Sequence, residues 1–81
     1  MSFLKGVYSN QMKFEDYKII LYRQEDGSWV AEIPSIPSCY ALMETREEAL
    51  AELAQVFKMI EESYGQRGIA LPADTTEFVN A

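Results

Sequence analysis

The sequence predicts a small α+β domain in the order β-β-β-α-β, in which one long helix covers one face of a small antiparallel sheet. Apolar residues repeat at helical spacing from Thr45 to Tyr64, and no other segment sustains that spacing. Before this segment, β-branched and aromatic residues form short runs separated by an Asp-Gly turn and a proline-rich connection. An isolated helix of this length is marginal in water, so its apolar stripe must pack on the sheet.

The length and composition indicate one folded domain. The chain has 81 residues, of which 48 % are hydrophobic and 25 % are charged, as in globular proteins. A chain this short buries only about 60 to 65 % of its unfolded surface, so we expect self-association to add stability. We assign residues 1–16 to an N-terminal arm, 17–72 to the domain and 73–81 to a C-terminal tail.

The first two strands are expected to form a hairpin. Residues 17–23 and 28–33 are rich in β-branched and aromatic side chains, and residues 24–27 connect them. Asp26-Gly27 can supply the positive φ that a tight hairpin turn requires. Trp29 is interpreted as the largest core side chain on the face that meets the helix.

Two further strands are predicted on either side of the helix. Residues 34–38 contain two prolines, which lack the N–H that a central strand needs, so they form a rigid connection. Residues 39–43 are short and apolar and form the third strand. Residues 69–71, which are closed by Pro72, are predicted to add a short edge strand after the helix.

The helix has recognisable start and stop signals. Thr45 is the expected N-cap, and Glu48 lies where its carboxylate can complete a capping box. Gly65 or Gly68 can adopt the left-handed conformation that ends a helix. The buried stripe is expected to contain Ala49, Leu50, Leu53, Val56, Phe57, Ile60 and Tyr64.

The composition argues against several classes of function. The chain has no histidine and a single cysteine, Cys39, so we expect no zinc site, no other metal, no cofactor and no internal disulfide. Cys39 is interpreted as a buried, unreactive side chain. The formal net charge of −6 favours a basic partner over nucleic acid. No signal peptide or spanning segment is evident, so we expect a cytoplasmic protein with no membrane contact.

A set of motif residues resembles the N-terminal module of HicB-type antitoxins. That family has an acidic hairpin ending in glycine, an aromatic-x-Ala strand, a Pro-x-Leu-Pro-Gly-Cys turn and a Thr-x-x-Glu-Ala-Leu helix start. Two family glycines are replaced here, by Ser38 and by Met43. The matching residues are Glu25, Asp26, Gly27, Trp29, Ala31, Pro34, Ile36, Pro37, Cys39, Thr45, Glu48, Ala49 and Leu50.

The resemblance implies a partial ribonuclease-H-like fold that oligomerises and blocks a small basic HicA-type toxin, a ribonuclease that cleaves mRNA. A nuclease of that fold needs several strand carboxylates around metal ions, but Glu32 is the only acid inside a predicted strand, so we expect no catalysis. Full-length HicB-type proteins carry a C-terminal DNA-binding domain, whereas this sequence ends nine residues after Pro72. We therefore expect no direct DNA binding.

Two interpretations of function remain open. In the first, the chain binds a basic ribonuclease toxin, with Glu25, Asp26, Glu47 and Glu48 as candidate contacts. In the second, it is a stand-alone, non-catalytic structural or ligand-binding oligomer. In either case Ile20 and Tyr22, on the sheet face that one helix leaves uncovered, are candidates for contact between copies in a dimer or tetramer.

Overall fold

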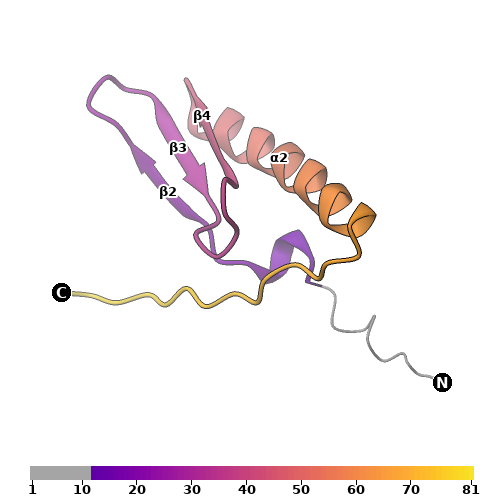
Figure 1. Cartoon of the computed structure of the whole chain (residues 1–81). Helices are drawn as coiled ribbons and strands as arrows, with labels where there is room; N and C mark the ends of the chain where they lie inside the picture. The colour runs from indigo at the N-terminus through magenta and orange to yellow at the C-terminus, as the bar shows by residue number, and fades with distance from the viewer. Residues whose placement is uncertain (1–11) are drawn as a thin grey trace.

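A computed structural model describes residues 12–81 and confirms the α+β architecture (Figure 1). A short 3₁₀ helix, η1 (Phe14–Asp16), precedes the strands β2 (Ile20–Arg23), β3 (Trp29–Glu32) and β4 (Tyr40–Met43), and the helix α2 (Arg46–Gln66) follows. The strands form an antiparallel sheet in the order β2-β3-β4, and α2 packs across β3 and β4. Residues 1–11 of the predicted arm lie outside the described residues.

The register of the sheet decides which side chains meet the helix. Leu21, Ala31 and Ala41 are cross-strand neighbours in one row. Ala31 and Ala41 are buried, and Leu21 packs against the same core. Because successive residues of a strand point to opposite faces, Ile20 and Tyr22 lie on the other face, which α2 does not cover.

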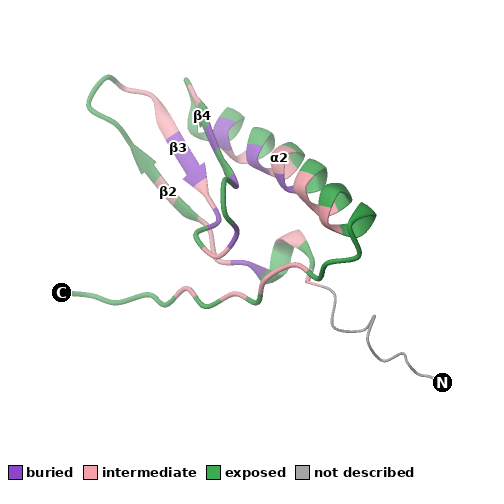
Figure 2. Cartoon of the chain, in the orientation of Figure 1, coloured by how far each residue is buried: buried purple, intermediate pink, exposed green. Residues whose placement is uncertain are grey.

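The core lies between the sheet, α2 and the residues around η1, as the purple segments in Figure 2 show. The apolar stripe of α2 is confirmed, with Ala49, Leu53 and Phe57 buried and its other aliphatic members packed at the core boundary. The buried residues of the core are Tyr17, Ala31, Ile33, Ile36, Cys39, Ala41, Ala49, Leu53 and Phe57.

The interpretation of Trp29 as the largest core side chain is wrong. Trp29 is only partly buried and packs against the boundary of the core, whereas the largest fully buried side chains are Ile33, Leu53 and Cys39. The register explains the difference, because Trp29 is the first residue of β3 and pairs with Arg23 and Met43 at the end of the sheet next to the hairpin turn.

The predicted ends of the helix are largely confirmed. The Thr45 hydroxyl accepts a hydrogen bond from the Glu48 backbone N–H at 3.1 Å. Within residues 12–81 no bond returns from the Glu48 carboxylate to Thr45, so only half of the predicted capping box forms. Gly68 has a φ of +68° and donates to the Gly65 carbonyl, while Ile69 donates to the Tyr64 carbonyl. This pair of bonds is a Schellman motif.

Two consecutive turns connect β3 to β4. Ile36 donates to the Ile33 carbonyl and Cys39 donates to the Ile36 carbonyl, each at 3.2 Å. In the second turn Ser38 follows Pro37 and has a φ of +65°, which is the geometry that favours glycine at this position. The replacement of the first family glycine therefore places a Cβ in the left-handed region, which is a source of strain. Met43 does not share it, since its φ is not positive.

Replacing Ser38 by glycine is expected to raise the free energy of unfolding by about 0.5 to 1 kcal/mol. A side chain in the left-handed region costs about 1 to 2 kcal/mol, and the greater freedom of glycine in the unfolded chain offsets part of that gain. Urea unfolding measures the change through the transition midpoint. Ser38→Ala keeps the Cβ and should bring no gain. A Ser38→Gly protein less stable than the wild type would contradict the strain.

The predicted edge strand at residues 69–71 is wrong. The structure contains no strand after α2 in the described chain, and the segment that follows Gly68 crosses the end of the sheet instead of running along an edge (Figure 1). Its direction is set by long-range contacts, because the Tyr17 hydroxyl donates a hydrogen bond to the Pro72 carbonyl. The first strand also begins three residues later than predicted, since the Lys18 N–H donates to Asp74 rather than to a neighbouring strand.

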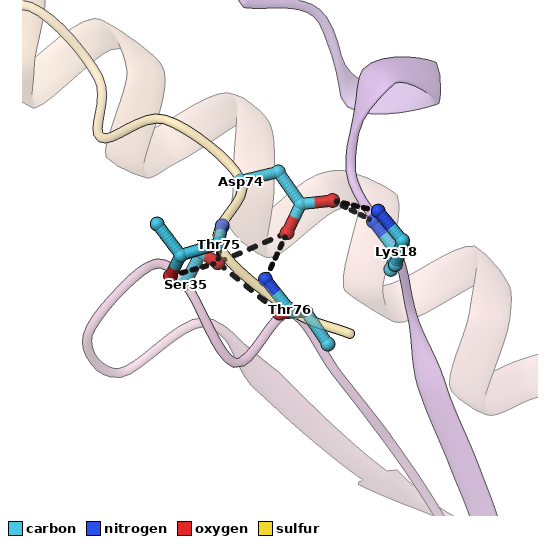
Figure 3. Close-up of polar contacts among 5 residues, drawn as sticks. All are labelled: Lys18, Ser35, Asp74, Thr75 and Thr76. Carbon is cyan, nitrogen blue, oxygen red and sulfur yellow. Dashed lines mark hydrogen bonds and ion pairs between the residues drawn. The ribbon is translucent and has the colours of Figure 1, made fainter. Parts of the chain in front are cut away.

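Asp74 anchors the C-terminal tail to two other parts of the chain (Figure 3). Its Oδ2 atom accepts from the Lys18 backbone N–H at 2.9 Å and from Lys18 Nζ at 3.3 Å. Its Oδ1 atom accepts from Ser35 Oγ at 3.0 Å and from the Thr76 N–H at 3.2 Å. The Thr75 N–H donates to Ser35 Oγ at 2.9 Å. The start of β2, the connection before β4 and the tail are thus joined at one point.

Replacing Asp74 by asparagine is expected to destabilise the protein at neutral pH and to make its stability less sensitive to acid. Burial alone would raise the pKa of the Asp74 carboxyl, but hydrogen bonds from Lys18, Thr76 and Ser35 outweigh it and hold the pKa well below its usual value. The stabilisation is fully present above the unfolded-state pKa of about 3.9 and is lost as the pH falls towards the folded-state value.

Thermal unfolding at pH 7 and near pH 3 tests this anchor. The difference in Tm between wild type and Asp74→Asn should be clear at pH 7 and smaller at the lower pH. Glu62→Gln, which removes an exposed carboxyl of α2, serves as the control for a general loss of charge. A difference between wild type and Asp74→Asn that grew on acidification would refute the assignment.

Candidate functional site

The hairpin turn and the start of α2 lie at the same end of the molecule (Figure 1). The pairing of Trp29 with Met43 places the beginning of β3 beside the end of β4, from which the chain enters α2. A shallow, open hollow between these segments is lined by Asp26, Gly27, Ser28 and Glu44. We call this region the acidic end and define it by Glu25, Asp26, Glu44, Glu47 and Glu48.

The hairpin turn is held by its own polar groups. Gln24 donates its N–H to the Ser28 carbonyl at 2.8 Å, and Gly27 donates to the Gln24 carbonyl at 3.0 Å. Gly27 has a φ of +94°, as the Asp-Gly pair predicted. Asp26 Oδ1 accepts from Ser28 Oγ at 2.6 Å and from the Ser28 N–H at 2.9 Å. The turn is therefore built to a fixed shape.

Asp26 and Glu25 differ in their surroundings. The hydrogen bonds from the side chain and then the backbone of Ser28 lower the pKa of the Asp26 carboxyl, so it stays ionised at neutral pH. Both residues are exposed. Asp26 thus supports the turn and carries charge at once, whereas Glu25 makes no side-chain hydrogen bond or ion pair within residues 12–81.

The helix start brings further carboxylates to the same end. Glu44, Glu47 and Glu48 are all exposed. Arg46 approaches Glu47 at 4.0 Å, at the limit of an ion pair, and both side chains are exposed, so Arg46 neutralises little of the charge. The structure therefore brings the four predicted contact residues, Glu25, Asp26, Glu47 and Glu48, to one end and adds Glu44, which the sequence analysis did not single out.

The acidic end consists of exposed carboxylates around a hairpin turn held by its own hydrogen bonds. Among residues 12–81 no three carboxylate or thiol side chains are placed to hold one metal ion. Cys39 directly precedes β4, and burial of its thiol raises the pKa of that group. The predicted burial of Cys39 is confirmed. Within the described part of the chain, no helix is both long and apolar enough to cross a bilayer.

The other motif residues have mainly structural positions. Ala31 and Ala49 are fully buried between sheet and helix, and Leu50 packs at the core boundary. Pro34 and Pro37 each follow the first residue of one of the two turns before β4. The sequence analysis missed the anchor formed by Lys18, Ser35 and Asp74. Asp74 is 56 residues from Lys18 and 39 residues from Ser35 along the chain, so no local pattern links it to them.

The chain is similar to small proteins of archaea and cyanobacteria. It is 30 % identical over 63 residues to the UPF0150 protein Ta0767 of Thermoplasma acidophilum, an alignment that covers 78 % of this chain and 91 % of that one. It is 47 % identical over 38 residues to the UPF0150 protein ssl0259 of Synechocystis sp., which covers 47 % and 52 % of the two chains. No protein-family profile and no solved structure matches the chain. The alignment with the Thermoplasma protein spans most of both sequences, and the chain therefore belongs to the UPF0150 family.

Proposed function

We propose that this chain is a HicB-like antitoxin, or a free-standing homologue, that binds and neutralises a small basic HicA-type ribonuclease by direct protein contact. Membership of the UPF0150 family, which is related to HicB-like antitoxins, supports the proposal. So does the fold, because the motif residues shared with the antitoxin module occupy the turns, the helix start and the core that define this domain.

The observation that carries the proposal is the convergence of five exposed carboxylates at the acidic end. Two come from the hairpin turn, one from the segment after β4 and two from the first turn of α2. Opposite charge on a partner would speed the encounter and orient it. Trp29 and Met43 lie side by side at the same end and are partly buried. Tryptophan is enriched among the residues that contribute most of the binding energy in protein interfaces.

Co-expression with a small basic ribonuclease encoded by an adjacent reading frame tests the proposal. The two proteins should co-purify, growth arrest by the ribonuclease should be relieved, and the purified chain should inhibit RNA cleavage. Replacing Glu25, Glu47 and Glu48 by Gln and Asp26 by Asn should abolish relief. The matched control removes four exposed or half-exposed carboxylates away from the acidic end, by Gln substitution of Glu15, Glu61, Glu62 and Glu77, and should retain it. Failure of the wild-type chain to co-purify or to relieve the arrest would refute the antitoxin function.

A second candidate function is a stand-alone, non-catalytic oligomer. It is favoured by the apolar sheet face that α2 leaves uncovered, where Tyr22, Tyr40 and Leu42 are exposed. The two candidates differ in what the acidic end does. If the chain is a stand-alone oligomer, neutralising Glu25, Asp26, Glu47 and Glu48 should leave its oligomeric state unchanged. The set of proteins that it binds in the cell should also stay the same.

A further inference from the structure

The sheet face opposite α2 is apolar and uncovered. The three strands place two cross-strand rows on it, Ile20 beside Glu32 and Tyr40, and Tyr22 beside Val30 and Leu42. Ile20 is 41 % exposed, Tyr22 44 %, Leu42 55 % and Tyr40 60 %. We call these six residues the open sheet face. Its only charged member is Glu32.

The C-terminal tail carries the most exposed large apolar side chains among residues 12–81. Phe78 and Val79 are 78 % and 80 % exposed, although neither side chain gains from contact with water. Residues 77–81 make no hydrogen bond to the rest of residues 12–81, and they extend away from the body beyond the end of the sheet (Figure 1). The anchor at Asp74 fixes the point from which this extension starts (Figure 3).

The tail cannot turn back over most of its own open sheet face. Thr76 is held by its N–H to Asp74 and by its hydroxyl at 3.1 Å from Ser35 Oγ. A chain reversal takes four residues, and only Glu77 separates Thr76 from Phe78. The Phe78 ring lies 5.9 Å from Lys18 Nζ at the start of β2, from which point the chain continues outward.

The open sheet face alone is too small to hold two copies together. Three strands about 4.8 Å apart and four residues of about 3.4 Å each give a patch of roughly 200 Å². A stable interface needs about 800 Å² from each partner. A dimer built on this face therefore needs further apolar surface, and residues 77–81, about 17 Å long when extended, are the part of the tail free to supply it.

We propose that a second copy of the chain covers the open sheet face and that the two copies exchange tails, so that Phe78 and Val79 of each copy pack on the open sheet face of the other. Such a two-fold interface uses the same surface on both copies. The acidic end lies at the opposite end of the sheet from the tail (Figure 1), so its five carboxylates stay away from the contact between two chains of net charge −6.

The mass of the full chain in solution tests the dimer. Sedimentation equilibrium should give two 9.3 kDa chains for the wild type. Phe78→Ser with Val79→Ser should weaken dimerisation by roughly 10- to 100-fold, since truncating central apolar side chains costs an interface that much. Both side chains are so exposed that circular dichroism should show an unchanged fold. Met59→Ser, at an exposed helix position, should leave the dimer intact. A monomeric wild type, or a dimer indifferent to the tail substitutions, would overturn the proposal.

A mixing experiment tests the exchange itself. Separately purified Phe78→Cys and Leu42→Cys proteins should form a disulfide-linked heterodimer when mixed and oxidised, because each tail would lie on the other copy. Met59→Cys in place of Leu42→Cys is the control for chance cross-linking. If the chain carrying both Phe78→Cys and Leu42→Cys closes a disulfide within a monomer and the mixed proteins do not link, the tail lies on its own sheet and the exchange is wrong.

Discussion

Replacing Phe57 by alanine is expected to lower the free energy of unfolding by about 3 to 5 kcal/mol. Phe57 is 4 % exposed and lies on the buried face of α2, next to the segment around η1. Its ring centroid is 5.4 Å from that of Phe14 and 5.8 Å from that of Tyr17, in tilted arrangements that aromatic pairs favour. The substitution would therefore open a cavity where three separate parts of the chain meet.

A loss of this size is a large fraction of the stability of so small a domain. Urea unfolding, followed by far-ultraviolet circular dichroism and by the fluorescence of Trp29, the sole tryptophan, measures it. Met59→Ala removes a large side chain two positions further along the same helix, where it is 61 % exposed, and should change stability by less than about 0.5 kcal/mol. Equal effects of the two substitutions would show that Phe57 is not a core residue.

The elements with strong local signals could be predicted from the sequence. The α2 helix is specified by its apolar stripe, by the Thr45 cap and by Gly68, all within one continuous segment. The hairpin follows from β-branched runs and from an Asp-Gly pair that supplies the positive φ. Each of these features depends on residues close together in the chain, so no knowledge of the tertiary fold was needed.

The features that depend on distant residues could not be predicted. Residues 69–71 have the composition of a strand, but the bonds of Tyr17 to Pro72 and of Lys18 to Asp74 carry the segment across the end of the sheet. Trp29 has the large apolar side chain that is typical of a core residue, but its position as the first residue of β3 leaves it partly exposed. In both cases tertiary position overrides the local preference.

The sequence identified the residues of the candidate site but did not show that they lie together in the fold. Asp26 and Glu25 could be recognised as a turn, and Glu47 and Glu48 as the acidic start of a helix. Their convergence depends on the register that sets Trp29 against Met43, which no spacing in the sequence reveals. Glu44 joins the acidic end for the same reason.

Neutralising the hairpin charges with Glu25→Gln and Asp26→Asn is expected to slow association with the proposed partner, a basic ribonuclease, about tenfold at low ionic strength, with little change in the dissociation rate. Asparagine keeps an oxygen that can accept the bonds from Ser28, so the shape of the turn should persist while its charge is lost. The difference from wild type should shrink above roughly 0.1 M salt, where the Debye length falls to about 10 Å. Stopped-flow mixing over a salt series gives both rates.

The matched control separates a local effect of the acidic end from an effect of net charge. Glu61→Gln with Glu62→Gln removes the same two charges from the far end of α2, about 20 Å from Glu47 along the helix at 1.5 Å per residue. That separation exceeds the Debye length of about 10 Å at 0.1 M salt, so at that ionic strength the control protein should associate nearly as fast as wild type, whereas the hairpin variant should still be slower. If both double variants slowed association equally, the partner would be sensing the total charge of the chain. A slower association confined to the hairpin variant would mean that the carboxylates brought together by the sheet register guide the encounter.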